Sequence, residues 1–348
     1  MISIAHLLDD FGMGGVTRAL TLFDQPTLKR LAQSNVVPMK PSAKVAPKLD
    51  ADLIVDHMSF SWARLPFLVS LRARNPGARI VHVEHSYTRG FEANTVTSKG
   101  RFRTMIQLCA LFFDDVICVS EAQRDWMAGE VGVSPTKLRV IYPWTDRESL
   151  FVIPPARQAD AQPVQLLAYG RFAEVKNFAS LISAMRYFSP GEVCLTLFGD
   201  GPQRGLLQAL AADLPNVDVF GPVDDPASFL ELCDAVIVPS HYEAFGLVAT
   251  EARMAARALI VADVDGLPEQ AQIGGRIAPM RTAEDIANSI RWAIGADLPK
   301  LGVAGRRNVQ GQHEQILRQW THLICSTRWA TQTTTSQGPQ RALGRAMV

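Results

Sequence analysis

Residues 239–269 read PSHYEAFGLVATEARMAARALIVADVDGLPE and follow a short apolar run, 235–238. Two carboxylates in this stretch, Glu243 and Glu251, stand eight residues apart. The pattern predicts a strand, then a loop with Glu243, then a helix that opens near residue 245 and carries Glu251 about one turn in. The first N–H groups of a helix lack partners within it and attract anions. Two acids and an anion-binding helix end therefore meet in one small volume, which suits a ligand that is part sugar and part phosphate.

Short apolar runs alternate with helical stretches in two series along the chain. This alternation is typical of parallel sheets with helices on both faces. A stretch rich in proline, 151–163, separates the two series and has the composition of a linker. We therefore predict two doubly wound domains with the ligand between them, at the C-terminal ends of the strands. The expected strands are 2–8, 53–55, 79–83, 115–119 and 138–142 in the first series, and 164–168, 193–198, 217–220, 235–238 and 259–262 in the second.

The composition is that of an ordinary globular protein. The 348 residues are enough for two domains, 47% of them are hydrophobic, and the net charge of +1 implies no nucleic-acid partner. The N-terminus has no basic start and meets Asp9 and Asp10 early, unlike a signal peptide, and no apolar run has the length of a membrane span. The scattered cysteines show no zinc or redox spacing, which favours buried thiols in a reducing cytoplasm; they are Cys109, Cys118, Cys194, Cys233 and Cys325.

Two further turns follow strands of the second series. Residues 170–177 (GRFAEVKN) offer the planar guanidinium of Arg171 and the compact charge of Lys176 where a diphosphate could sit, although a solvated basic loop is the plain alternative. In residues 198–202 (FGDGP) the glycines would let the backbone approach a ligand, and a simple tight turn explains the same residues equally well.

The two carboxylates, Pro239-Ser240 before them and Gly266-Leu267-Pro268-Glu269 after them together resemble glycosyltransferase family 4. The likeness is strong over residues 164–295 and weak over residues 1–150. It implies a GT-B fold, in which two Rossmann-like doubly wound α/β domains face each other across a cleft. It also implies a retaining glycosyltransferase that moves a sugar, a hexosyl group, from a nucleoside-diphosphate sugar to a hydroxyl of a glycan or lipid-linked acceptor.

The resemblance also assigns roles on the donor side. Arg171 and Lys176 match the family's diphosphate-binding pair, Glu243 the acid that binds hydroxyls of the transferred sugar, and Glu251 the acid that takes the ribose hydroxyls. Further donor-binding residues implied in this half are Gly170, Gly199 beside the base, and the backbone of Ala244, Phe245, Gly246 and Leu247.

In the first half, Gly14-Gly15-Val16-Thr17-Arg18 resembles the family's Gly-Gly-x-Glu-Arg loop, which faces donor and acceptor. Gly14 and Gly15 are therefore expected to bind the donor, although Thr17 stands where the family has glutamate. His85 resembles the histidine that faces the acceptor and sugar, and it completes the expected catalytic set with Arg171, Lys176 and Glu243.

The resemblance divides the chain into consecutive parts. Residues 1–152 would form the acceptor-side domain, 153–163 a linker and 164–298 the nucleotide-sugar domain. A helical segment at 299–328 would pack back onto the first domain, and 329–348 would be a disordered tail.

Three departures from the family pattern follow the two glutamates. Ala256 and Ala258 replace glycine and proline, and Asp265 replaces the first glycine of a pair. The alanine mainly costs backbone freedom. Asp265 would add an acid near the expected diphosphate.

Other functions remain open at this stage. A nucleotide-sugar epimerase or a phosphorylase can share the architecture, and a non-catalytic nucleotide-sugar-binding protein is a third alternative. The broken glycine fingerprint disfavours a dinucleotide dehydrogenase. We expect no cofactor and no obligatory metal, a role in cell-surface polysaccharide or glycolipid synthesis, and a cytoplasmic location. Residues 101–113, amphipathic with a basic start, could touch the membrane surface, although a core-facing helix is the plain alternative.

Overall fold

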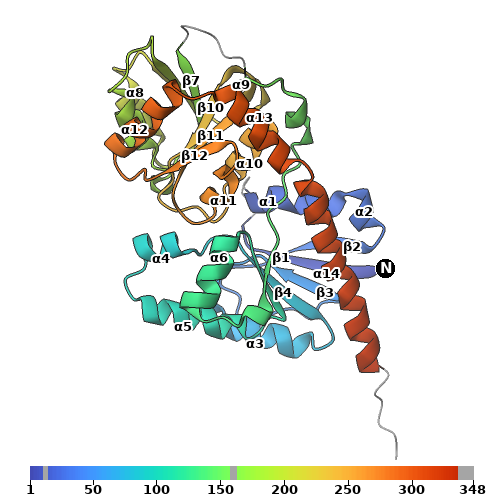
Figure 1. Cartoon of the computed structure of the whole chain (residues 1–348). Coiled ribbons are helices and arrows are strands. Elements are labelled where there is room, and N and C mark those ends of the chain that lie inside the picture. Colours follow the sequence, from blue (N-terminus) through green and yellow to red (C-terminus); the bar gives the residue numbers. More distant parts are fainter. Residues whose placement is uncertain (11–14, 157–162, 336–348) are drawn as a thin grey trace, which may run out of the picture.

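A computed structural model describes residues 1–10, 15–156 and 163–335 of the chain. It has two halves, each built around a twisted sheet with helices on both sides, and the last helix, α14, runs from the second half along the first (Figure 1). Within the described residues, the strands form two six-stranded sheets, and every strand pair in them is parallel.

The first sheet has the order β2-β1-β3-β4-β5-β6. Successive side chains of its strands point to opposite faces, so the sheet contributes side chains to two hydrophobic cores, one on each face. Ile54 and Val116 pack with helices α3 and α5 on one face, whereas Val55 and Ile117 pack with α14 on the other. The strands are β1 (Ile2–Leu8), β2 (Ala32–Pro38), β3 (Leu53–Asp56), β4 (Arg79–Glu84), β5 (Asp115–Cys118) and β6 (Leu138–Val140).

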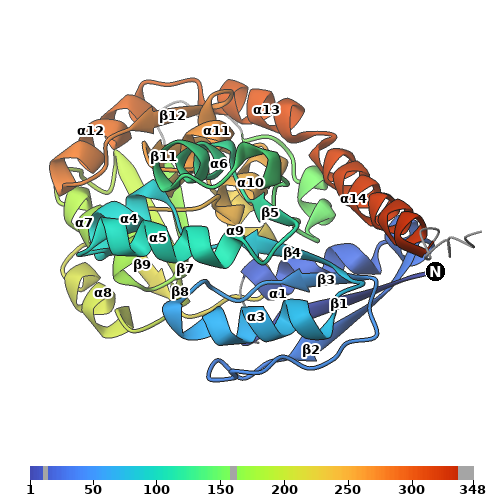
Figure 2. The same cartoon turned by 90° about the horizontal axis from the view of Figure 1, so that it is seen from below.

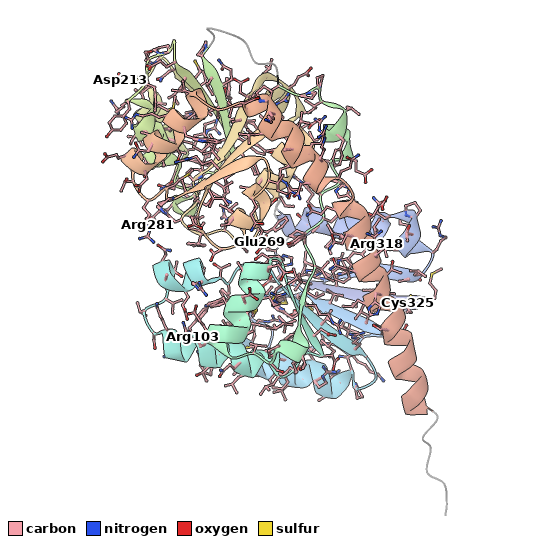
Figure 3. The ribbon with its side chains drawn as sticks, in the orientation of Figure 1. Arg103, Asp213, Glu269, Arg281, Arg318 and Cys325 are labelled. Carbon is pink, nitrogen blue, oxygen red and sulfur yellow. The ribbon has the colours of Figure 1, made fainter. Side chains whose placement is uncertain are left out.

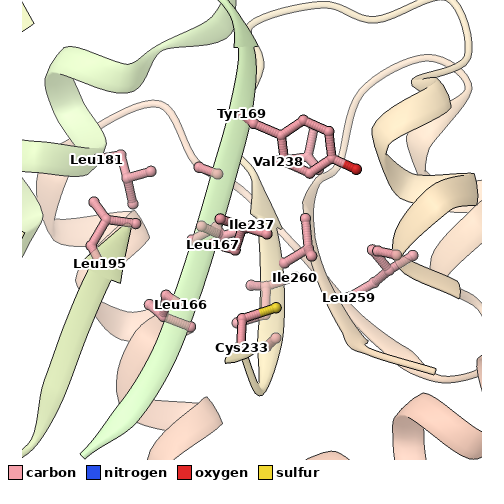
Figure 4. Packing of buried hydrophobic residues seen from close by; sticks show 14 of the residues in the cluster. Leu166, Leu167, Tyr169, Leu181, Leu195, Cys233, Ile237, Val238, Leu259 and Ile260 are labelled. Carbon is pink, nitrogen blue, oxygen red and sulfur yellow. The ribbon is translucent and has the colours of Figure 1, made fainter. Parts of the chain in front are cut away.

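The second sheet has the order β12-β11-β10-β7-β8-β9 and carries the larger core. Leu166, Ile237 and Leu259, on three neighbouring strands, lie among its buried side chains (Figure 4). The strands are β7 (Val164–Arg171), β8 (Val193–Asp200), β9 (Val217–Phe220), β10 (Ala235–Val238), β11 (Ala258–Ala262) and β12 (Gly275–Ala278).

Helices fill the connections between strands and cover both faces of each sheet (Figures 1 and 2). In the first half they are α1 (Gly15–Ala19), α2 (Pro26–Lys29), α3 (Leu65–Arg74), α4 (Arg89–Thr95), α5 (Lys99–Ala110) and α6 (Glu121–Trp126), and in the second half α7 (Phe178–Met185), α8 (Arg204–Ala211), α9 (Ala227–Leu232), α10 (Leu247–Met254), α11 (Leu267–Ala271), α12 (Ala283–Ile294), α13 (Leu298–Val309) and α14 (Gln312–Thr335). Short helical turns add η1 (Leu20–Asp24), η2 (Trp62–Arg64), η3 (Met127–Val131), η4 (Pro135–Lys137), η5 (Glu148–Val152) and η6 (Glu174–Lys176).

The two predicted parallel sheets are confirmed, and the ends of the expected strands differ from the observed ends by at most three residues. The sequence missed β2 and β12, each at one edge of its sheet, and it also missed α2, α4 and α11.

The C-terminal segment differs from the expectation in its length. The helical segment expected at 299–328 is two helices, and α14 continues to Thr335, so residues 329–335 of the expected disordered tail are helical. Ile316, Trp320 and Leu323 of α14 are buried against the first sheet. The rest of the tail, 336–348, and most of the expected linker, 157–162, lie outside the described residues.

Across the described ranges, none of the helices combines the length and the apolar character needed to cross a membrane.

Candidate functional site

The ends of β7 and β8 bring two glycine turns of the second half together. Gly170 and Gly199 are partners in the parallel register and have positive φ angles of 135° and 150°. A Cβ on Gly199 would lie 1.9 Å from the carbonyl oxygen of Gly170, so only glycine allows the two turns to come this close. Arg171 ends β7, and its side chain is exposed.

Lys176 and Glu243 form an ion pair between two loops of the second half. The Lys176 ammonium donates a hydrogen bond to Oε2 of Glu243, and Ser240 Oγ lies 3.4 Å from the same oxygen. Both charged side chains keep partial exposure, 23% for Lys176 and 17% for Glu243. The structure therefore places a cation and an acid side by side where a ligand can reach both.

Helix α10 begins directly after this pair. Gly246 precedes its first residue with φ of +86°, which is a left-handed conformation that suits glycine. Gln270 Nε2 donates to the carbonyl oxygens of Phe245 and Gly246 at 2.6 and 2.9 Å, and these hydrogen bonds stabilise the turn before α10. The side chain of Phe245 is buried against Tyr142 of the first half, with ring centroids 5.1 Å apart.

Glu251 lies one turn inside α10 and is almost fully buried. Its Oε2 accepts a 2.7 Å hydrogen bond from the Tyr169 hydroxyl. Its Oε1 faces Arg147 Nε at 3.2 Å and Arg18 Nη1 at 3.4 Å, and both arginines come from the first half of the chain. Burial raises the pKa of Glu251, while Arg147, Tyr169 and Arg18 act in the opposite direction.

His85 follows β4 and ends a chain of hydrogen-bonded histidines. His85 Nε2 lies 3.0 Å from His57 Nδ1, and His57 Nε2 lies 3.0 Å from His6 Nδ1, which continues to Ser34 Oγ through His6 Nε2 at 2.9 Å. Burial lowers the pKa of His85 to about 4 and that of His6 to about 3. The rings are therefore neutral near pH 7, and each can donate through one nitrogen and accept through the other.

A second buried network supports the loop that carries His85. Arg64 binds both oxygens of Asp56, and His82 bonds Asp56 through Nδ1 at 3.0 Å. The Glu84 carboxylate accepts the N–H groups of Ser86 at 2.8 Å and Tyr87 at 3.0 Å, and so fixes the turn after His85. Although burial lowers the pKa of His82, its hydrogen bonds to Asp56 and Glu84 raise it overall.

The loop after β11 joins the two halves, and it contains Asp265. From the sequence this acid is expected near the diphosphate. In the structure its Oδ1 accepts from Gly90 N at 2.9 Å, and its Oδ2 accepts from Thr88 Oγ1 at 2.8 Å and from Glu243 N at 3.1 Å. Asp265 thus engages the first half of the chain and the backbone beside Glu243, and it acts as a link between the two halves.

Glu269, four residues later, makes a second contact between the two halves (Figure 3). Its carboxylate accepts the N–H groups of Glu121 and Ala122, at 3.1 and 2.7 Å, and the Tyr142 hydroxyl at 3.0 Å. The N–H groups belong to the first turn of α6, whose dipole favours a negative partner.

The structure thus brings most of the expected donor-site residues to one edge of the second sheet. Gly15 opens α1, and Gly14 lies outside the described residues. Sequence reasoning missed Arg147 and Tyr169 beside Glu251, and it missed His6 and His57 behind His85. These residues stand in unremarkable strands and loops, and only the folded chain brings them to their partners.

Among the residues with assigned positions, no group of three or more His, Cys, Asp or Glu side chains is arranged to hold a metal ion.

Comparison with known proteins decides the family. Residues 152–301 match the model of the glycosyl transferases group 1, and residues 18–149 match that of glycosyltransferase family 4. The chain belongs to glycosyltransferase family 4. The predicted resemblance is therefore confirmed, and it extends over the first half, where the sequence pattern was weak.

Relatives of known name are distant. A glycogen synthase of Mycobacterium tuberculosis is 35% identical over 160 residues, which are 44% of this chain and 38% of that protein. A D-inositol 3-phosphate glycosyltransferase of Thermobifida fusca is 25% identical over 272 residues, 69% of this chain and 62% of that protein. The chain thus spans less than two thirds of the length of these curated relatives.

The solved structure of Anabaena HepE in complex with UDP and glucose superimposes with a TM-score of 0.74 at 17% identity, over 94% of this chain and 100% of that one. At this identity the likeness concerns the fold alone. It agrees with the family match, and the predicted GT-B arrangement of two Rossmann-like domains is confirmed.

Proposed function

We propose that this family 4 protein is a retaining glycosyltransferase that moves a hexosyl group from a nucleoside-diphosphate sugar to a hydroxyl of a glycan or lipid-linked acceptor. The observation that carries the proposal is the pair Lys176–Glu243 at the start of α10. A cation and helix N–H groups suit the diphosphate, whereas a carboxylate suits sugar hydroxyls. HepE, which has the same fold, was solved with UDP and glucose.

In this proposal the second half stabilises the leaving nucleotide. Negative charge grows on the phosphate as the glycosidic bond breaks, and Arg171, Lys176 and the first turn of α10 supply the compensating positive charge. Glu243 binds hydroxyls of the transferred sugar. The acceptor attacks the face from which the nucleotide leaves, and a donor phosphate oxygen helps to take the acceptor proton. The proposal requires no metal or other cofactor.

Glu251 is proposed to bind the ribose hydroxyls, which requires that one of its present contacts is replaced. Its carboxylate already meets Tyr169, Arg147 and Arg18, and the contact with Arg18, at 3.4 Å, is the longest of the three. A ribose hydroxyl would replace Arg18 there and leave its charge free to turn toward the diphosphate.

His85 is proposed to face the acceptor as a neutral ring, because burial lowers its pKa to about 4. It lines a small cavity together with His57, Tyr142 and Trp144. Since Tyr142 stacks on Phe245, this cavity adjoins the segment of Glu243.

We further propose that the enzyme works in the cytoplasm on cell-surface polysaccharide or glycolipid precursors. Part of α5 faces the core through Met105 and Ile106, as the plain alternative expected. Leu108 and Leu111 are nevertheless 37% and 67% exposed, and the basic Arg101 lies on the same helix. This outer surface supports peripheral contact with an anionic membrane.

A thermal-shift screen against uridine, guanosine and adenosine diphosphate sugars tests the proposal. A donor that binds the folded state should raise the melting temperature, since a ligand at a hundred times its Kd adds about 2.7 kcal/mol of stability. Release of nucleoside diphosphate in the presence of an acceptor would then show transfer. An epimerase would convert the donor without any acceptor, and a non-catalytic binding protein would release no nucleotide.

Glu243→Ala is the matched variant for the sugar-binding role. It should abolish most transfer while free nucleoside diphosphate binds nearly as before, because Glu243 is assigned to the sugar. Loss of nucleotide binding in a folded variant would contradict that assignment, and a wild-type protein that none of the donors stabilises would contradict the function as a whole.

A further inference from the structure

Asp265 holds the two halves of the protein and the Glu243 segment at one point. It lies in the loop between β11 and α11 with φ of +45°, a left-handed conformation that aspartate tolerates better than most residues. One oxygen, Oδ2, accepts from both Thr88 Oγ1 and the backbone N–H of Glu243, while Oδ1 accepts from Gly90 N. Two of these three donors belong to the first half and the third to the candidate sugar-binding residue.

The backbone of Glu243 is held on its other side as well. The N–H of Gly266 donates to the carbonyl oxygen of Glu243 at 3.2 Å. Residues 265 and 266 therefore form hydrogen bonds with both backbone polar groups of Glu243, its N–H and its C=O. The direction of the Glu243 side chain consequently depends on where this loop sits.

The close fit around the loop leaves no room for a side chain at Gly90 or Gly266 in this arrangement. A Cβ on Gly90 would lie 2.5 Å from Asp265 Oδ2 and 2.6 Å from the Tyr242 Cβ. A Cβ on Gly266 would lie 2.3 Å from Ala244 O and 2.9 Å from the Ser120 Cβ in the first half. Two glycines thus let each half approach side chains of the other closely beside Glu243.

We propose that Asp265 is a positioning residue that makes the placement of Glu243 depend on closure of the two halves. Together the halves offer the carboxylate three donors. When they separate, Thr88 and Gly90 withdraw, and the carboxylate keeps only the Glu243 N–H of its three donors, so the loop loses its support from the first half. The inference rests on the proposed role of Glu243 toward the transferred sugar. It concerns a residue by which this chain departs from its family, whose pattern has glycine at this position.

The test compares Asp265→Gly, Asp265→Asn and Glu269→Gln in the full chain. Glycine accepts the positive φ but lacks the carboxylate. Asparagine keeps one oxygen, which can still accept from Thr88 and Glu243, but it faces Gly90 N with an amide. Glu269→Gln alters the second contact between the same halves without touching the Glu243 segment, so it serves as the matched control.

Asp265→Gly should lower kcat about ten- to a hundred-fold, as expected for lost hydrogen bonds to a charged acceptor, with little change in the Kd for free nucleoside diphosphate. Asp265→Asn should recover part of this loss, and Glu269→Gln should lower kcat several-fold less than Asp265→Gly. Equal losses in Asp265→Gly and Glu269→Gln would overturn the inference, because both residues would then merely hold the halves together.

Amide hydrogen exchange supplies a measurement that needs no activity. In Asp265→Gly the peptide around Glu243 should exchange faster, while the peptide around Glu121 and Ala122 keeps its protection. Unchanged protection around Glu243 would overturn the positioning role even in an active enzyme. The expected exchange pattern in a protein without transferase activity would instead refute the proposed function and leave the link between Asp265 and Glu243 standing.

Discussion

The ion pair of Lys176 and Glu243 joins residues 67 positions apart in the sequence. The sequence motifs nominated both residues, one for phosphate and one for sugar, but not their contact. The contact follows from topology, because β7 and β10 are neighbours in the sheet and their C-terminal loops share one edge. The charge of Lys176 therefore serves two partners, the carboxylate and the expected phosphate.

Lys176→Ala should lower kcat about ten- to a hundred-fold, since one charge-assisted hydrogen bond in the transition state contributes about 1.5–3 kcal/mol. Steady-state rates with the donor found in the screen measure this loss. Lys300→Ala, at an exposed position of α13, is the control and should match the wild type. Turnover at the wild-type rate in Lys176→Ala would remove this residue from the catalytic set.

Two departures from the family pattern, Ala256 and Asp265, have positive φ angles of 51° and 45°. Both replace glycine, which adopts such angles without strain. The sequence located these positions but could not show that the backbone keeps the left-handed conformation. For Asp265 the carboxylate gains three partners. At Ala256 the left-handed conformation is offset only by the packing of a methyl group.

Ala256→Gly should raise the free energy of unfolding by up to about 1 kcal/mol, because relief of left-handed strain exceeds the added entropy of the unfolded glycine. Urea denaturation measures the change. Ala255→Gly, at the preceding residue with φ of −75°, should destabilise the protein instead. A variant Ala256→Gly less stable than the wild type would show that the methyl packing outweighs the strain.

At the scale of elements, the central strands were predictable, whereas one edge strand of each sheet, β2 and β12, was missed. β3 and β10 are short strands that are buried at every position and apolar except for Asp56 at the end of β3, which is the pattern of a central parallel strand. β2 reads AQSNVVP and is buried only at Ala32, so its polar residues resemble a loop. It is a strand because β1 pairs with it along seven residues, a partnership that no local pattern shows.

Helix α4, also missed, matters because its first turn meets the second half. Gly90→Ala should weaken the closed arrangement, since the new Cβ would lie 2.5 Å from Asp265 Oδ2 and 2.6 Å from the Tyr242 Cβ. Small-angle scattering should show a larger radius of gyration, and kcat should fall. Gly100→Ala, in α5, is the matched control, because its new Cβ would have no atom within 4 Å apart from its chain neighbours and its own helix backbone. Equal behaviour of the two variants would mean that the halves do not close through α4.

At the scale of the whole molecule, long-range contacts join the C-terminal helix α14 to the first half of the chain. Arg79 in β4 donates to Ser326 Oγ in α14 at 2.6 Å, and Trp320 packs against Phe23 with ring centroids 5.0 Å apart. The C-terminal helix thus completes the core of the N-terminal half. Together with Asp265, Glu269 and Arg147, it makes the two sheets parts of one structure.

The buried histidines make stability depend on pH. The pKa of His6 is lowered by burial to about 3 and that of His85 to about 4, against 6.5 for an ordinary histidine. Below pH 6.5 the unfolded chain therefore takes up protons that the folded chain refuses, and the free energy of unfolding falls as the pH drops from 6.5 toward 4. Each histidine contributes at most about 1.4 kcal/mol per pH unit. His82 acts in the opposite direction, because its pKa is raised in the folded state.

Urea denaturation across this pH range measures the slope, and His6→Gln provides the comparison. The variant lacks one of the three histidines with a lowered pKa, His6, His57 and His85, so its stability should fall less steeply with decreasing pH. A slope identical to that of the wild type would show that His6 is protonated in the folded protein.

The sequence by itself determined the family and the two parallel sheets, and it nominated the residues of the expected donor site. It could do so because strands buried on both faces and glycine turns leave local patterns. The tertiary structure alone decided which side chains meet: Lys176 with Glu243, Arg147 with Glu251, and His85 with His57. It also showed that Asp265, which the sequence places near the expected phosphate, links the two halves. Such contacts depend on strand order and on the docking of one half against the other, and neither is encoded in any single stretch of the chain.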